Sequence, residues 1–251
     1  MTTLGHPVLR EAQGELSLCF DDGTIQSRAL QNDPARLLLD YTRLMMGFLL
    51  LQPRPARIGM IGLGGGSLAR YCALKLPATD FTAIEISPQV IALRDACGIP
   101  PDGPRFRVHC ADGAAFVLDD GGEPLDVLLV DGFDRAGQPD QLCSAVFYGA
   151  CRERLAASGL LVVNLYVDEE TDARVDRIRA SFGGKVVVVG ADDTDNMIVF
   201  AGTETTFPPP FNQLVERLRT LTPLHPVGLD TTLHKLLQYR EPRRVNRKRS
   251  R

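Results

Sequence analysis

The chain has 251 residues, of which 44% are hydrophobic and 24% charged, with 23 glycines and 17 prolines. These proportions are typical of one globular domain with a small extension, and they exclude a disordered, collagen-like or solenoid protein. Because 28 Lys and Arg are set against 31 Asp and Glu, the net charge of -3 argues against a dedicated nucleic-acid binder.

The six cysteines show no C-x-x-C pair and no zinc-ligand spacing with a histidine. We therefore expect reduced core cysteines and no metal site. The longest apolar run, 45–51, is far shorter than the roughly 20 residues of a membrane-spanning helix. The N-terminus also lacks a basic segment followed by a long apolar stretch, so we expect a cytoplasmic protein without a membrane contact.

Residues 1–33 predict a small β-hairpin that forms a lid. Two short alternating apolar segments, 15–20 and 24–29, flank the turn signal Asp21-Asp22-Gly23. Asn32-Asp33-Pro34 then predicts a helix start, and apolar residues recur at helical spacing until Pro53. The main domain is expected over 34–239.

From Arg57 onward, predicted strands and helices alternate. The strands are 58–61, 81–86, 105–109, 125–130 and 159–165, and the helices are 67–75, 88–97, 114–118 and 141–156. Such alternation requires a parallel sheet covered on both faces. After a helix at 173–182, strands 185–189 and 197–201 are joined by a short loop, so the last strand is expected to be antiparallel. Amphipathic helices at 211–221 and 231–239 complete the domain.

This layout predicts an α/β fold: a doubly wound, Rossmann-like S-adenosylmethionine-dependent transferase fold with a seven-stranded, mostly parallel sheet. The last segment, 240–251, contains seven Lys and Arg residues. It is interpreted as a solvated basic tail, with contact to RNA or to an acidic partner as the alternative.

Open α/β sheets bind ligands at the carboxyl ends of their strands, where this sequence places glycines and acids. The loop 62–66 contains Gly62, Gly64 and Gly65, which let a ligand approach the backbone and a helix N-terminus. Such a loop suits a nicotinamide, a flavin or S-adenosylmethionine, or is only a tight turn. Glu85, followed by Ile86, lies where a carboxylate accepts both ribose hydroxyls; otherwise it is a surface acid.

Two further acidic segments follow the next strands. Asp112, beside Gly113, lies where an adenine amino group would find an acceptor. Asp131 and Asp134 flank Phe133 in one turn, and paired acids suggest recognition of a cation or removal of a proton from it. Solvated acids in an Asx-type turn are the alternative.

Over roughly residues 15–201, these features resemble the polyamine aminopropyltransferases, meaning the spermidine and spermine synthases. The resemblance rests on the hairpin with Gln26, the glycine loop, Glu85, Asp112-Gly113, the Asp131-x-x-Asp134 pair and Phe147-Tyr148. It implies a homodimer whose co-substrate is decarboxylated S-adenosylmethionine, with a small-molecule amine as acceptor and no prosthetic group or metal. It further implies that Gln26 and Glu85 hold the nucleoside, Asp112 contacts adenine, Asp131 acts on the attacking amine, Asp134 helps to bind the polyamine, and Tyr41 contacts the amine.

The sequence also departs from this family. The family's glycine loop carries an Asp for the aminopropyl amino group, and the aligned residue here is Gly65. Arg135 replaces a proline after the second Asp of the pair. Three functions therefore stay open: aminopropyl transfer, methyl transfer from intact S-adenosylmethionine, and non-catalytic binding of a nucleoside. The apolar stretch 45–49 has two interpretations, a dimer interface or core burial.

Overall fold

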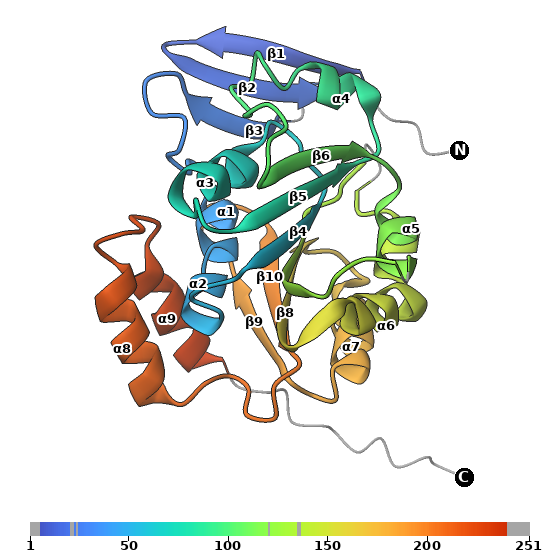
Figure 1. Ribbon diagram of the computed structural model, residues 1–251, viewed down its shortest axis with the longest axis vertical. Helices are drawn as coiled ribbons and strands as arrows, with labels where there is room; N and C mark the ends of the chain where they lie inside the picture. The colour runs from blue at the N-terminus through green and yellow to red at the C-terminus, as the bar shows by residue number, and fades with distance from the viewer. Residues whose placement is uncertain (1–5, 21–22, 24, 120, 135–136, 240–251) are drawn as a thin grey trace.

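The computed structural model describes residues 6–20, 23, 25–119, 121–134 and 137–239. These residues form a seven-stranded sheet with helices on both faces, and a separate three-stranded sheet at the N-terminal end (Figure 1). The predicted basic tail, two residues of the Asp21-Asp22-Gly23 turn, and Arg135 lie outside the described residues.

The central sheet has the strand order β6-β5-β4-β7-β8-β10-β9. All pairings from β6 to β8 are parallel, whereas β10 runs antiparallel to both β8 and β9. The predicted seven-stranded, mostly parallel sheet with an antiparallel last strand is therefore confirmed. The strands are β4 (Arg57–Ile61), β5 (Asp80–Glu85), β6 (Phe106–Cys110), β7 (Leu125–Val130), β8 (Leu155–Tyr166), β9 (Val186–Gly190) and β10 (Asn196–Gly202).

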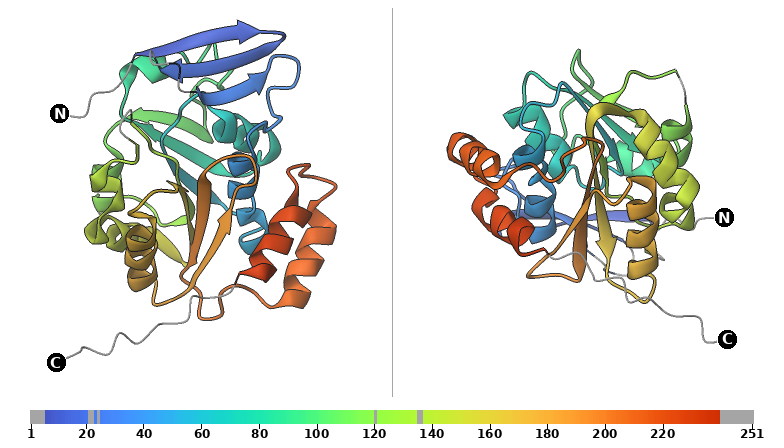
Figure 2. Two further views of the ribbon diagram at one scale, coloured as in Figure 1. Left: turned by 180° about the vertical axis from the view of Figure 1, so that it is seen from behind. Right: turned by 90° about the horizontal axis from the view of Figure 1, so that it is seen from below.

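Both faces of this sheet are apolar, as expected for parallel strands buried between helices. Successive side chains of β7 alternate between two core clusters: Val127 and Leu129 belong to one, Leu128 and Val130 to the other. The helices on the two sides appear in the views of Figures 1 and 2. Residues of the first cluster come from α1 (Asp40–Met45), α2 (Phe48–Leu51), α3 (Ser67–Lys75), α4 (Pro88–Ala92), α8 (Phe211–Leu221) and α9 (Leu229–Gln238), and those of the second from α5 (Gly113–Leu118), α6 (Ala145–Arg154) and α7 (Thr171–Ser181).

The N-terminal sheet contains the predicted hairpin and one strand more. β2 (Glu15–Phe20) pairs with β3 (Ile25–Leu30), and β1 (Pro7–Ala12) pairs with β2 on the other side, all antiparallel. The turn from β1 to β2 has positive φ at both Gln13 and Gly14, as the commonest two-residue hairpin turns require. Because β1 is mostly exposed, its sequence lacks the apolar alternation that reveals a half-buried strand.

The helix predicted to begin near Pro34 begins at Asp40 instead, because Leu39 still has extended backbone angles. It is also divided at Gly47, between α1 and α2. A Cβ at Gly47 would overlap the Thr232 side chain of α9, so the absence of a side chain lets the two segments pack closely. The apolar stretch 45–49 is core: its Met, Phe and Leu side chains are 0% exposed. Dimerisation remains a prediction without support from this stretch.

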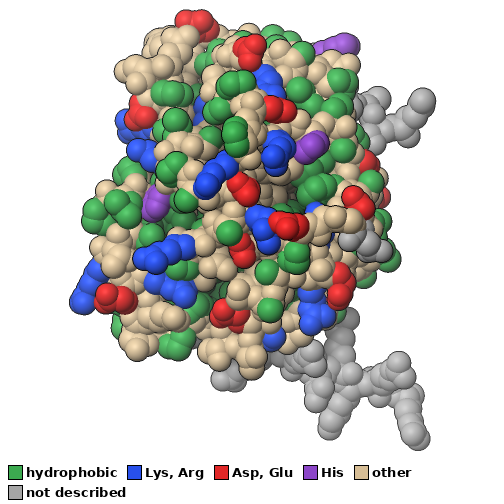
Figure 3. Space-filling model, viewed as in Figure 1, with side chains coloured by type: hydrophobic (Ala, Val, Ile, Leu, Met, Phe, Trp, Pro, Cys, Tyr) green, Lys and Arg blue, Asp and Glu red, His purple; other side chains and the backbone are tan. Residues whose placement is uncertain are grey.

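All six cysteines are free thiols; five are buried, but Cys110 at the end of β6 is exposed, contrary to the expectation of core positions. None of the described helices is long and apolar enough to cross a membrane. Acidic and basic side chains are interspersed over the face shown in Figure 3, in keeping with the small net charge.

Candidate active site

A pocket with a volume of about 480 Å³ lies at the carboxyl ends of β4, β5, β7 and β8, under the hairpin β2–β3. This is a usual volume for a site that binds a small molecule. The position agrees with the rule that open α/β sheets bind ligands where their strands end. Almost all predicted site residues line it, namely Gln26, Tyr41, Gly62, Gly64, Gly65, Glu85, Ile86, Gly113, Asp131 and Asp134; Asp112 does not.

The glycine loop brings neighbouring strand ends into close contact. Gly62 has a φ of +89°, and a Cβ there would overlap the main-chain oxygen of Asp131. The buried guanidinium of Arg70 in α3 donates hydrogen bonds to the main-chain oxygens of Gly65 and Cys97. The loop is therefore fixed from behind, and its open side faces the pocket.

The space beside Gly65 is filled from another element. A Cβ at Gly65 would overlap the hydroxyl of Ser27, which β3 places against the loop. Ser27 is buried and lines the pocket together with its neighbour Gln26. The pocket thus has a neutral hydroxyl at this point.

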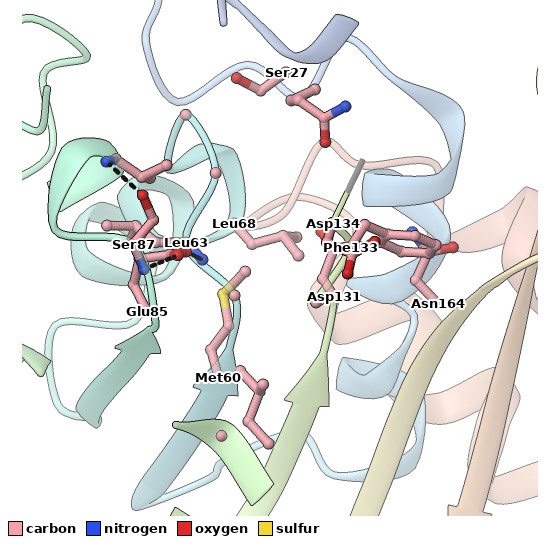
Figure 4. Close-up of a pocket in the computed structure, with 18 of the residues that line it drawn as sticks. Ser27, Met60, Leu63, Leu68, Glu85, Ser87, Asp131, Phe133, Asp134 and Asn164 are labelled. Carbon is pink, nitrogen blue, oxygen red and sulfur yellow. Dashed lines mark hydrogen bonds between the residues drawn. The ribbon is translucent and has the colours of Figure 1, made fainter. Parts of the chain in front are cut away.

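Glu85, at the end of β5, is buried and organises the backbone around it. Its Oε2 accepts a hydrogen bond from the Leu63 N–H (2.8 Å), and its Oε1 accepts one from the Ser87 N–H (2.8 Å). A carboxylate has about four acceptor positions, so each oxygen retains capacity for a ligand hydroxyl. On this side of the pocket, the backbone is thereby arranged around the Glu85 carboxylate (Figure 4).

Asp112 is the N-cap of α5 and not a lining residue. Its Oδ1 accepts hydrogen bonds from the N–H groups of Ala114 (2.7 Å) and Ala115 (2.9 Å). Its Oδ2 accepts one from the Nε2 of Gln141 (3.1 Å), and Gln141 and Gly113 do line the pocket. Asp112 consequently reaches the site through the residues that it holds.

Asp131 lies on the opposite side of the pocket from Glu85, at the end of β7 (Figure 4). Desolvation raises the pKa of its carboxyl to about 6, although a hydrogen bond from Asn164 (2.8 Å) acts in the opposite direction. The Tyr41 phenol of α1 lies within electrostatic reach: its pKa is raised well above the usual value, first by desolvation and then by the charge of Asp131. At neutral pH, this side of the pocket combines a carboxylate with a neutral phenol.

Asp134 and Phe133 follow in the same loop. The Asp134 N–H donates to the Gly137 oxygen (2.8 Å), and the Gly137 N–H donates to the Asp134 oxygen (3.2 Å). The side chains of Phe133 and Asp134 lie beside Asp131 (Figure 4). The predicted pair of acids therefore shares one end of the pocket.

The described lining is acidic. It contains the carboxyls of Glu85, Asp131 and Asp134, and two phenols, but no Lys, Arg or His among the described residues. A pocket with this lining favours cationic ligands.

The sequence analysis missed several polar lining residues, among them Ser27, Gln141, Asn164, Tyr166 and Asn196. Asn164 carried a usable signal. It is a single amide within the apolar run from Leu160 to Leu165, near the carboxyl end of a strand, and a buried polar side chain there needs a partner.

Comparison with curated proteins identifies close relatives. A polyamine aminopropyltransferase of Neisseria meningitidis serogroup A is 35% identical over 224 residues, covering 88% of this chain and 83% of that protein. Another from Chromobacterium violaceum is 38% identical over 187 residues, covering 74% of this chain and 71% of the relative. The chain belongs to the polyamine aminopropyltransferase family. The resemblance inferred from the motifs is thus confirmed, although no family model matches the chain.

A solved structure agrees with this assignment at the level of the fold. A probable spermidine synthase from Corynebacterium glutamicum superposes with a TM-score of 0.72 at 20% identity, covering 88% of this chain and 86% of the other. This member of the polyamine aminopropyltransferase family therefore has the fold of the spermidine synthase. In this chain, Ser27 of the hairpin contacts Gly65 of the glycine loop.

Proposed function

We propose that the protein transfers an aminopropyl group from decarboxylated S-adenosylmethionine to an amine such as putrescine, releasing methylthioadenosine. The observation that carries this proposal is the acidic pocket in a chain of the polyamine aminopropyltransferase family. Three carboxyls face one cavity, one from the end of β5 and two from the loop after β7, and its described lining lacks a basic side chain.

The reaction explains why such a pocket is needed. Its donor carries a sulfonium and its acceptor an ammonium, so the two substrates repel each other. Two unit charges 4 Å apart interact by about 4 kcal/mol at an effective dielectric of about 20. Carboxylates on both sides of the cavity, Glu85 on one and Asp131 with Asp134 on the other, offset this repulsion while the substrates meet.

The nucleoside end of the donor is assigned to the half of the pocket around Glu85. Glu85 accepts the ribose hydroxyls with the acceptor capacity that its two backbone hydrogen bonds leave, and Gln26 covers the sugar from β3. The base lies toward Gly113 and Gln141, whose amide is held by Asp112. The aminopropyl chain then points toward Asp131.

Asp131 is assigned the proton transfer. An alkyl amine has a pKa of about 10.4, so it is protonated at neutral pH and cannot attack. Asp131, with a pKa of about 6, is mostly ionised at pH 7 and is a stronger base than an ordinary carboxylate. It takes one proton from the ammonium, the freed nitrogen forms a bond to the carbon beside sulfur, and the carbon–sulfur electron pair passes to sulfur.

Methyl transfer from intact S-adenosylmethionine is the second candidate. The contact between Ser27 and Gly65 favours methyl transfer, because it is neutral: there is no carboxylate at this position that would repel the carboxylate of the methionine tail. The choice between the two donors is therefore the first question for an experiment.

Calorimetry with decarboxylated S-adenosylmethionine, intact S-adenosylmethionine and methylthioadenosine, followed by putrescine or spermidine, distinguishes these functions. We expect tight binding of the decarboxylated donor and of methylthioadenosine, and spermidine formation from putrescine. Preference for the intact donor without amine binding would favour methyl transfer, and nucleoside binding without turnover would favour a non-catalytic protein.

Asp131→Asn tests the proton acceptor. The neutral amide should abolish aminopropyl transfer but keep methylthioadenosine binding, since Asp131 lies across the pocket from Glu85. Asp172→Asn, an exposed acid in α7, is the matched control and should transfer at the original rate. An active Asp131→Asn protein would contradict the assignment.

A further inference from the structure

We propose that Asn164 and Asn196 are positioning residues that orient Asp131 as the proton acceptor, an inference that rests on the proposed function. The two amides and the carboxylate form a continuous hydrogen-bonded series, here called the amide relay. Asn196 Nδ2 donates to Asn164 Oδ1 (2.9 Å), and Asn164 Nδ2 donates to Asp131 Oδ1 (2.8 Å). All three residues line the pocket.

The relay is built by the pairing of β8 with β10. In their antiparallel register, Asn164 lies opposite Ile198 and Asn196 lies opposite Tyr166. The two asparagines are thus diagonal neighbours two residues apart in register, a spacing at which side chains on one face interact. Asn164 is only 2% exposed, and its neighbours Val163 and Leu165 belong to the core.

The direction of the relay follows from the chemistry of an amide, which has a donor end and an acceptor end. A carboxylate accepts only, so the Asn164 amide must present its NH₂ group to Asp131. The reversed amide would set Oδ1 of Asn164 against the Asp131 oxygen. Asn196 supports the observed orientation, because its NH₂ group donates to the acceptor end of Asn164.

The relay assigns different tasks to the two oxygens of Asp131. Oδ1 is held by Asn164, so Oδ2 is left to meet the ammonium. The NH₂ group of Asn164 cannot accept a proton from Asp131. The relay therefore stabilises the carboxylate, and a proton that Asp131 takes from the ammonium stays on Asp131. This hydrogen bond lowers the pKa of Asp131, whereas desolvation raises it.

Other titratable groups share the pocket and must be considered. They are Tyr41 from α1, Glu85 from β5, Asp134 from the loop after β7 and Tyr166 from β8. Tyr41 is a neutral phenol at neutral pH, and desolvation followed by the charge of Asp131 raises its pKa still further above the usual value. Among the described lining residues, β10 and the hairpin contribute uncharged polar groups, namely Asn196, Gln26 and Ser27.

The first test is a titration of the Asp131 carboxyl by carbon-13 NMR of aspartate-labelled protein, with Asp131→Asn identifying the resonance. Asn164→Leu removes the charge-stabilising donor and keeps a similar volume. We expect it to raise the Asp131 pKa by about one unit or more, since hydrogen bonds to charged groups are among the stronger ones. Asn196→Leu should raise it by a smaller amount.

Gln138→Met is the matched control. Gln138 is also a buried amide in this region, but its Nε2 donates to the main-chain oxygen of Asn164 (3.4 Å), outside the relay. This variant should leave the Asp131 titration unchanged. A shift as large as that of Asn164→Leu would overturn the proposal.

Kinetics give a second readout. If the pKa rises by one unit, the ionised fraction of Asp131 falls about fivefold at pH 6 and hardly at pH 8.5. Asn164→Leu should therefore lose about fivefold in kcat at pH 6 and regain activity at pH 8.5, with the KM for the donor nearly unchanged. A purely structural role would reduce the rate equally at all pH values, and that result would overturn the proposal.

Failure of the relay and failure of the proposed function give different results. An unchanged Asp131 titration in folded Asn164→Leu overturns the relay, whatever the activity. If Asn164→Leu does not fold by circular dichroism, Asn196→Leu decides in the same way. A wild-type protein that transfers no aminopropyl group overturns the proposed function, and the NMR titration still tests the action of the relay on Asp131.

Discussion

A carboxylate placed in a desolvated pocket destabilises the fold that contains it. The pKa of Asp131 is raised from 3.8 to about 6, so its ionised form is less favourable in the folded than in the unfolded chain. The difference of about two units corresponds to roughly 3 kcal/mol when the group is fully ionised in both states. The penalty develops as the pH rises between the unfolded-state value of 3.8 and the folded-state value of about 6; it is complete well above pH 6 and absent well below pH 4. This residue is therefore kept at a cost in stability.

Asp131→Asn should stabilise the fold at pH 8 by about 2 kcal/mol, because an uncharged side chain of similar shape avoids that penalty. Near pH 3.5, where Asp131 is protonated in the wild type, the two proteins should be nearly equal. Urea denaturation at both pH values measures the difference. A gain of the same size at both would show that desolvation of the charge is not its cause.

Other residues show how far the sequence alone could lead. Glu85, Asp131 and Asp134 were found because Glu85 ends one apolar strand and the two Asp residues come shortly after another, and the ends of parallel strands meet at one edge of a sheet. Ser27 had no such signal. Its role depends on the contact between β3 and the glycine loop, which joins segments almost forty residues apart and follows no local pattern.

At the scale of elements, the bounds of a strand or helix were predicted best where its apolar residues follow a regular pattern. β7, buried on both faces, was predicted with its observed bounds, and so was the strongly amphipathic α8. β1 was missed because most of its side chains are exposed. The helix after Pro34 was predicted too early, since its apolar spacing continues through residues 36–39, which are not helical.

The helix cap at Asp112 links an element to the site. Asp112→Ala removes the N-cap of α5 and frees Gln141. We expect a loss of stability of about 1 kcal/mol and weaker binding of methylthioadenosine. Ser144→Ala is the matched control: Ser144 caps α6 by accepting from the Phe147 N–H (3.0 Å), and its hydroxyl donates to the main-chain oxygen of Gln141 (3.4 Å) but holds no lining side chain. Urea denaturation and calorimetry of both variants separate the two effects. If Asp112→Ala and Ser144→Ala bind methylthioadenosine with equal affinity, Asp112 has no role in the site.

At the scale of the whole molecule, the pocket joins parts of the chain that are distant in sequence. Its lining runs from Leu18 in the N-terminal sheet to Asn196 at the start of β10. β10 contributes because it inserts antiparallel between β8 and β9, which brings Asn196 next to Asn164. The strand order, and not any local motif, thus determines that the last hairpin of the sheet reaches the acids.

Because the pocket spans two sheets, a ligand should stabilise both. Methylthioadenosine at a hundred times its dissociation constant should add about 2.7 kcal/mol to the free energy of unfolding. Hydrogen exchange should then slow in β2 and β3 as well as in β4 and β5, because Leu18, Gln26 and Ser27 face the same cavity as Glu85. α8, which does not line the site, serves as the internal reference for local protection. Slower exchange in β4 and β5 alone would mean that the N-terminal sheet moves independently of the bound nucleoside. That result would contradict a role for the β2–β3 hairpin in the binding site.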